Sequence, residues 1–127
     1  MKSKITDAEL QVLKILWDKG PSTVKDVHNK LEKKRPTGYT TTLKIMQIMA
    51  QKALLSVDKS QRQHIYHSNI AKGKVQRKRL NQLIESTFGG SASSLMMQLL
   101  NREETTQEEL NAIKAYIDKL DQDDTTA

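Results

Sequence analysis

The feature that most constrains this chain is a pair of helix-start signals set close together near its N-terminus. Thr6 with Glu9, and Thr23 with Asp26, have the spacing of capping boxes, in which each of two residues accepts a hydrogen bond from the backbone amide of the other. The glycine-proline pair at residues 20–21 ends the first helix before the second begins. Because so few residues connect the two helices, they must cross at a steep angle, as in a helix-turn-helix.

Apolar spacing extends this pattern to a third helix and a hairpin. Apolar residues recur at helical intervals in residues 10–17, 24–31 and 39–53. The buried stripe of the third helix is predicted to consist of Thr42, Ile45, Met46, Met49 and Ala53. The β-rich runs 54–57 and 64–68 flank a polar, basic tip and predict a hairpin. We therefore predict a mainly α fold with a small β wing: a winged helix-turn-helix DNA-binding domain followed by a helical dimerisation region.

Helical apolar stripes return after residue 71. They predict a helix that ends at the glycine pair 89–90, a short helix, and a last helix begun by a third capping box, Thr106 with Glu109. A monomer would expose these stripes to water, so we expect a homodimer. The winged-helix domain is assigned to residues 1–70 and the dimerisation region to residues 71–127. The expected interface residues are Leu80, Leu83, Ile84, Phe88, Leu95, Leu99, Leu110, Ile113, Ile117 and Leu120.

The charges of the chain are segregated along its length. The net charge is +6, but residues 1–84 hold 18 Lys or Arg against 6 Asp or Glu, whereas residues 85–127 hold 3 against 9. A charged, solvated surface is the ordinary reading of such residues taken singly. A basic front half joined to an acidic back half instead favours nucleic acid or an anionic surface as the partner of the front half alone. Together with the helix order and the hairpin, it makes double-stranded DNA the predicted partner.

The third helix begins with the weakest helix formers of its sequence. Threonine is a mediocre helix former because its β-branch restricts χ1, yet Thr40, Thr41 and Thr42 stand together behind Gly38. The first amides of a helix have no intrahelical partner and lie at the positive end of the dipole, so a phosphate is favoured there. Thr40 and Thr41 would add hydroxyl donors, and Tyr39 a phenolic one. These three residues are therefore the predicted phosphate contacts.

Further residues of the same face are candidates for reading bases. Lys44 can donate to guanine and Gln47 can pair with adenine in the major groove. Leu43 and Ile48 either meet thymine methyl groups or pack under the hairpin, and the sequence leaves both open. At the hairpin tip, Lys59 and Arg62 are placed for backbone or minor-groove contact. The predicted DNA-binding residues are Tyr39, Thr40, Thr41, Leu43, Lys44, Gln47, Lys59 and Arg62.

Several classes of function find no support in the sequence. Without cysteine there are no disulfides or thiolate metal sites, and no apolar run approaches the ~20 residues of a membrane span. The N-terminal sequence lacks the apolar segment of a secretory signal, so we expect a cytoplasmic protein. The three histidines form no recognisable ligand set, and no catalytic carboxylate pair, phosphate loop or nucleophile–base pair is evident. We expect no enzyme activity, metal or cofactor.

The chain resembles the penicillinase-repressor family of bacterial winged-helix regulators, the BlaI/MecI/CopY group, over nearly its whole length. The resemblance is carried by TDAELQVLKILWDKGPSTVKDVHNKL, GYTTTLKIMQIMAQKALL and RQHIYHSN. Such proteins are homodimers that repress by occupying an inverted-repeat operator, with C-terminal helices forming the dimer contact. By position, the resemblance implies that Tyr39, Thr40 and Thr41 hold phosphate, and that Thr40, Leu43, Lys44 and Gln47 face the groove.

The chain also departs from the family pattern. Many relatives have Arg at the position of Ile48 and Gly at that of Ala53. The copper-responsive branch carries a C-terminal cysteine cluster that is absent here, so copper sensing is not implied. The β-lactam-responsive branch is cleaved by a sensor protease near an Asn-Phe bond in the fifth helix. The aligned region here contains Gln98 and Leu99, with Asn101 and Arg102 nearby, which leaves proteolytic induction open.

Two other functions remain compatible with this fold. A winged-helix module could bind protein through its hairpin or its apolar stripes, although such a module has no need of a basic front half. A ligand- or metal-sensing regulator is the other alternative, and it requires a pocket that the sequence does not reveal.

Overall fold

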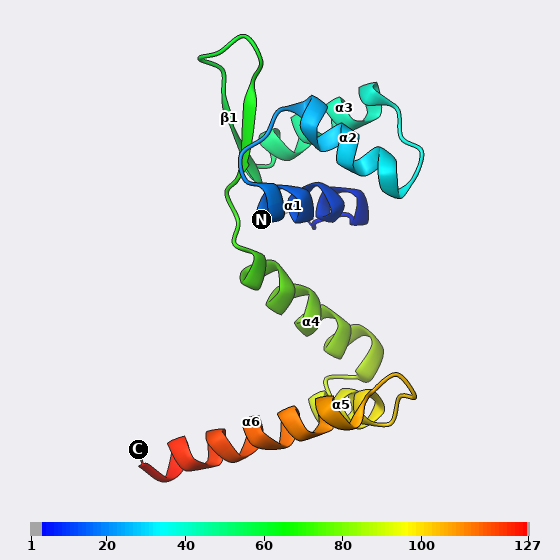
Figure 1. Cartoon of the computed structure of the whole chain (residues 1–127), viewed down its shortest axis with the longest axis vertical. Coiled ribbons are helices and arrows are strands. Elements are labelled where there is room, and N and C mark those ends of the chain that lie inside the picture. The colour runs from blue at the N-terminus through cyan, green and yellow to red at the C-terminus, as the bar shows by residue number, and fades with distance from the viewer. Residues whose placement is uncertain (1–3, 127) are drawn as a thin grey trace. The chain divides into compact units, whose positions relative to one another are not determined.

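The computed structural model describes the backbone of residues 4–126 and the side chains of residues 4–123, with helices and one hairpin in the predicted order (Figure 1). The elements are α1 Asp7–Lys19, α2 Val24–Lys34, α3 Tyr39–Gln51, β1 Leu55–Asp58, β2 Ile65–Ser68, α4 Lys72–Phe88, α5 Ala92–Leu100 and α6 Gln107–Thr126. The chain divides within α4 into two compact units, Met1–Arg77 and Lys78–Ala127. The first unit contains three helices and an antiparallel hairpin, which confirms the winged-helix prediction.

The predicted caps are all present. Thr6 Oγ1 accepts from the Glu9 amide at 3.1 Å, and Glu9 Oε1 accepts from the Thr6 amide at 3.0 Å. Thr23 and Asp26 make the same reciprocal pair at the start of α2. Gly20 ends α1 with φ 91°, a left-handed conformation that favours glycine. Local sequence therefore determines where α1 and α2 begin and where α1 ends.

The core of the first unit lies where α1, α2 and α3 meet the hairpin. Its members are Val12, Leu13, Ile15, Leu16, Val24, Val27, Leu31, Met46, Met49, Leu55, Tyr66 and Val75. Ser22 and Tyr66 exchange backbone hydrogen bonds of 3.0 and 2.8 Å, which ties the α1–α2 connection to β2. The Trp17 indole donates to the Ile70 carbonyl at 2.9 Å and so fixes the segment that follows the hairpin to α1. These contacts hold the hairpin against the three helices.

Both strands begin one residue later than the sequence predicts, and β1 also ends one residue later. Leu55 pairs with Ser68 and Asp58 with Ile65, so that the strands cover 55–58 and 65–68 rather than 54–57 and 64–68. Residues 59–64 form the connecting tip.

The end of α3 is the clearest correction to the sequence analysis. The helix stops at Gln51, and Ala53, predicted to lie on its buried stripe, is exposed with φ 64°. Of that stripe Thr42, Met46 and Met49 are buried, while Ile45 is half-buried. The Leu54 amide donates to the Met49 carbonyl at 2.9 Å, so the chain closes α3 with a left-handed residue, as helices that end in glycine do.

Replacing Ala53 with glycine should therefore stabilise the protein. The left-handed conformation costs an L-residue about 1–2 kcal/mol, and the greater unfolded-state entropy of glycine offsets about 0.5–1 kcal/mol of the gain. We expect the free energy of unfolding to rise by about 0.5–1 kcal/mol in urea titration. A lower free energy of unfolding for Ala53→Gly would contradict the assigned conformation.

A long-range ion pair joins the start of α1 to the end of α3. Glu9 is 4 % exposed, and Lys52 Nζ lies 2.9 and 2.8 Å from its two carboxylate oxygens. Burial acts to raise the pKa of Glu9, but the hydrogen bonds from Lys52 and Thr6 and the charge of Lys52 together lower the pKa below its ordinary 4.5. Glu9 thus caps α1 and anchors α3 at once.

The second unit has no buried side chain among residues 78–123, the part of it whose side chains are described. The glycine pair at 89–90 ends α4 with positive φ at both residues, and Ser91 caps α5. Thr106 and Glu109 form the third predicted capping box at the start of α6. The helices of this unit are therefore locally well specified, while their apolar residues stay at least partly exposed to water.

Candidate nucleic-acid interface

The start of α3 differs from that of the other capped helices. Its N-cap residue is Gly38, which provides no side-chain hydrogen bond to the first turn, and that turn holds no acidic residue. Helices α1 and α2 instead begin with reciprocal side-chain caps. The first amides of α3 are therefore left for another acceptor, and an anion is the acceptor that the helix dipole favours there.

The side chains predicted to contact phosphate lie on the surface. Tyr39 is 48 % exposed, and Thr40 and Thr41 are exposed as well. Thr42, the third of the run, is fully buried and belongs to the core side of the helix. Because successive residues on a helix point about 100° apart, Thr40 and Thr41 face solvent while Thr42 packs in the core.

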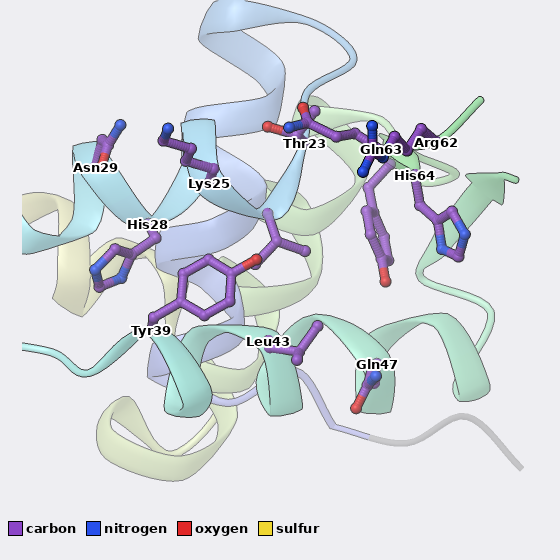
Figure 2. A pocket seen from close by; sticks show the side chains of 12 residues that line it. Thr23, Lys25, His28, Asn29, Tyr39, Leu43, Gln47, Arg62, Gln63 and His64 are labelled. Carbon is purple, nitrogen blue, oxygen red and sulfur yellow. The ribbon is translucent and has the colours of Figure 1, made fainter.

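An open hollow of about 660 Å³ lies between α2, α3 and the hairpin. Figure 2 shows Tyr39, Leu43 and Gln47 at successive turns of α3, with residues of α2 opposite them and the end of the hairpin tip beside them. The residues that line it are Thr23, Val24, Lys25, His28, Asn29, Tyr39, Leu43, Gln47, Arg62, Gln63, His64 and Tyr66. None of these described residues carries a carboxylate, so the hollow presents donors and positive charge.

Thr40 and Lys44, two further predicted residues of α3, do not line the hollow. They are exposed and lie with Gln47 and Gln51 at helical spacing along one face of α3. Leu43 is half-buried, packs against the core and also lines the hollow. Ile48 is exposed.

The two basic residues of the tip are placed differently. Arg62 lines the hollow, whereas Lys59 is exposed and does not. The neighbouring Asp58 accepts a hydrogen bond from the Ser60 amide at 2.9 Å, and the hydrogen bonds from Ser60 lower the pKa of Asp58. The carboxylate nearest the tip is therefore engaged in the turn.

The structure adds residues that the sequence analysis did not propose for the interface. Lys25, His28 and Asn29 face the hollow from α2, and Gln63 and His64 face it from the tip (Figure 2). The sequence signal of these residues is weak. Lys25, Asn29, Gln63 and His64 are ordinary exposed polar residues, His28 is half-buried, and only the packing of α2, α3 and the hairpin brings them to one place. Burial, with the nearby Tyr39 phenol acting in the same direction, raises the pKa of Tyr66, which also lines the hollow.

The predicted dimer residues share an apolar, solvent-accessible setting. Leu80, Leu83, Leu99, Ile117 and Leu120 are exposed, and Ile84, Phe88, Leu95, Leu110 and Ile113 are half-buried. In the region aligned with the family cleavage site, Gln98 and Leu99 lie in α5, Asn101 follows its last turn, and Arg102 is in the connection to α6. All four are exposed.

Two further findings concern the described residues. They contain no helix long and apolar enough to cross a membrane. Among them there is also no group of three or more His, Cys, Asp or Glu side chains arranged to hold a metal ion.

Three helices, a hairpin packed on them and a hollow beside the third helix, with no carboxylate among its described lining residues, define a winged-helix protein of the kind that binds nucleic acid. The sequence profile of the family described as penicillinase repressor matches residues 5–119. The chain belongs to this family, which consists of transcriptional repressors and not of enzymes.

Individual relatives agree with this assignment. The penicillinase repressor of Bacillus licheniformis is 22 % identical over 116 residues, which cover 91 % of each chain. The methicillin resistance regulatory protein MecI of Staphylococcus aureus is 18 % identical over 91 % of this chain and 94 % of its own. The transcriptional regulator BlaI of Mycobacterium tuberculosis is 34 % identical over 65 residues, 50 % of this chain and 47 % of that protein.

A solved structure shares the fold. A MarR family protein from Bacillus stearothermophilus superposes with a TM-score of 0.53 at 21 % identity, covering 97 % of this chain and 77 % of that one. At this identity the likeness concerns the fold alone, and it agrees with the winged-helix assignment.

Proposed function

We propose that this protein is a homodimeric, sequence-specific DNA-binding repressor that places α3 in the major groove of an inverted-repeat operator. The observation that carries the proposal is the exposed, uncapped start of α3 beside a hollow lined by donors and free of carboxylates among its described residues. The basic balance of residues 1–84 supports the same partner. Such a repressor would act in the cytoplasm, where the bacterial chromosome lies.

In this proposal two sets of residues divide the contacts with DNA. The free amides at the start of α3, with Tyr39, Thr40 and Thr41, receive a phosphate, and Lys25 and Arg62 face the same strand across the hollow. Lys44 and Gln47 lie on the face of α3 that points away from the core, where base edges can be reached. Phosphate contacts thus set the position and α3 reads the sequence.

The second unit supplies the dimer contact in this proposal. Apolar side chains of α4, α5 and α6 are left exposed or half-buried in one chain, and a second copy would cover them. Two copies of α3 held about 34–36 Å apart would read two half-sites separated by one turn of DNA. The operator is therefore expected to be palindromic.

Base reading and phosphate contact can be separated by mutation. Lys44→Ala or Gln47→Ala should reduce discrimination between operator and random duplex by about 1–3 kcal/mol each, because a bidentate contact to a base edge is lost. Lys59→Ala or Arg62→Ala should weaken binding to both duplexes alike and lower the salt slope by about one. Fluorescence anisotropy titrations on both duplexes at two or more salt concentrations measure these effects.

Either of two outcomes would contradict this assignment. Unchanged discrimination in both α3 variants would show that α3 does not read the bases. Absence of salt-sensitive duplex binding by the wild-type protein would instead favour the protein-docking alternative.

A further inference from the structure

A second hollow, of about 500 Å³, is lined by residues of α1, α2 and the first residue of α4. We call it the lysine hollow, because lysines make up six of its nine lining residues: Lys14, Lys19, Lys30, Lys33, Lys34 and Lys72. The hollow beside α3 is lined by two basic residues, Lys25 and Arg62. No residue of α3 lines the lysine hollow. Most of the basic charge that lines the two hollows is therefore not used in the proposed contacts of α3 with DNA.

The six lysines have little negative charge around them. All six are exposed, and none forms an ion pair with a residue that the structure describes. Asp18 carries the one carboxylate among the described lining residues. Residues 59–84 contain no Asp or Glu, so the start of α4, with the exposed Lys74 and Arg77, adds further positive charge. This surface therefore lacks a counter-charge of its own, and a polyanion would supply one.

The helix dipoles account for only part of this cluster. Three of the lysines lie in the last turn of α1 or α2, where a cation is stabilising. Lys14 and Lys30 instead lie within their helices, and Lys72 lies at the start of α4, where the dipole disfavours a cation. Lys30 also lies one turn from Lys34, and like charges at this spacing repel each other. Capping of the helices thus leaves Lys14, Lys30 and Lys72 unexplained.

The two hollows lie on opposite sides of α2. Of the residues of this helix, 24, 25, 28 and 29 line the hollow beside α3, and 30, 33 and 34 line the lysine hollow. At 100° per residue, the mean directions of these two sets differ by about 160°. A straight duplex held against α3 therefore leaves the lysine hollow open to a second one.

We propose that the lysine hollow and the adjoining start of α4 bind the phosphate backbone of a second DNA duplex while α3 holds the operator. Each lysine that neutralises a phosphate releases a counterion, so this binding is independent of base sequence. The charge is spread over three helices, which suits a long polyanion better than a small phosphate compound. The protein thus bridges two DNA segments. The inference rests on the proposed function for the first duplex and goes beyond it for the second.

Trp17 reports on the lysine hollow directly. It is the single tryptophan of the chain, is half-buried, and lines this hollow but not the one beside α3. Its fluorescence should change little with one equivalent of operator and should then change when random duplex is added at low salt. No response to the random duplex would overturn the inference. A response to tripolyphosphate but not to duplex would also overturn it, since the hollow would then be a site for a small phosphate compound.

A bridging experiment tests the lysines themselves. Lys14→Gln with Lys30→Gln and Lys72→Gln removes the three charges that the helix dipoles leave unexplained. Immobilised operator is saturated with protein, washed, and mixed with a fluorescent random duplex at low salt. We expect this triple variant to hold the operator within about twofold of wild type, but to capture at least about tenfold less of the second duplex.

A matched control removes the same charge elsewhere. Lys4→Gln with Lys114→Gln and Lys119→Gln changes three exposed lysines that line neither hollow, and it should capture the second duplex as wild type does. Capture that is equal in the two triple variants would overturn the inference while leaving the proposed function intact. Weaker operator binding by the first variant would also overturn it, because its lysines would then contact the first duplex. Absence of operator binding by the wild-type protein would instead be the failure of the proposed function.

Discussion

Replacing Lys52 with methionine should lower the free energy of unfolding by about 2–3 kcal/mol. The substitution leaves the buried Glu9 carboxylate with the Thr6 amide in place of the two hydrogen bonds from Lys52 Nζ. Breaking a buried pair by removing one partner costs about 3–5 kcal/mol, and the partial exposure of Lys52 reduces the expected cost here. Urea unfolding at neutral pH measures this change in the free energy of unfolding. As a control, Lys44 is an exposed lysine within α3, and Lys44→Met should change the free energy of unfolding by less than about 0.5 kcal/mol.

The same variant should reverse the contribution of Glu9 to the pH dependence of stability. In the wild-type protein the pKa of Glu9 is lowered, so its contribution is present above pH 4.5 and is lost as pH falls through the folded-state pKa. In Lys52→Met burial acts with far less opposition, so the pKa of Glu9 is expected to lie above its ordinary value. The free energy of unfolding of the Lys52→Met protein should then rise as pH falls from about 7 to about 5, because the folded state binds the proton at Glu9 more readily than the unfolded state does. Parallel pH profiles for the two proteins would contradict the ion pair as described.

Placing charges on the apolar face of α6 should dissociate the proposed dimer. Ile117 and Leu120 are 48 % and 46 % exposed in one chain and are assigned to the dimer contact. In Ile117→Glu with Leu120→Glu, symmetry puts both charges on each side of the interface, where burying an unpaired carboxylate costs several kcal/mol. We expect the dimer dissociation constant to rise at least about thousandfold in sedimentation equilibrium. Operator affinity should fall to that of an isolated half-site.

A charge control distinguishes this effect from general repulsion. Lys119→Glu changes the charge of the same exposed helix by more than either apolar substitution does, yet it lies outside the predicted interface residues. It should leave the dimer and operator binding largely unchanged. Dissociation by Lys119→Glu to the same extent, or a doubly charged variant that remains dimeric, would contradict the assigned face.

The sequence predicted those parts of the fold that depend on neighbours along the chain. Capping boxes at Thr6, Thr23 and Thr106 are local patterns, and each marks an observed helix start. The end of α3 was predicted wrongly, because Ala53 continues the apolar spacing while its backbone is left-handed. What ends α3 is the contact of the following residues with the hairpin and core, which spacing within one helix cannot reveal.

In the candidate site, too, the features set by local sequence could be predicted and those set by packing between elements could not. The exposed face of α3 could be predicted from helical periodicity, and so could the exposure of Tyr39, Thr40 and Thr41. The contribution of α2 could not, because it depends on the crossing of two helices that brings Lys25 and Asn29 over the hollow. Glu9 shows the same difference. Its capping role is local and could be predicted, whereas its ion pair with Lys52, 43 residues away, could not.

The most direct test of the central claim is selection of bound duplexes from a random pool by the wild-type protein. A dimer that presents two copies of α3 to the major groove predicts an enriched inverted repeat, with half-site centres about one helical turn or a multiple of it apart. Enrichment of a single unrepeated site would contradict the dimeric arrangement. A pool that shows no enrichment at all would contradict sequence-specific recognition by α3.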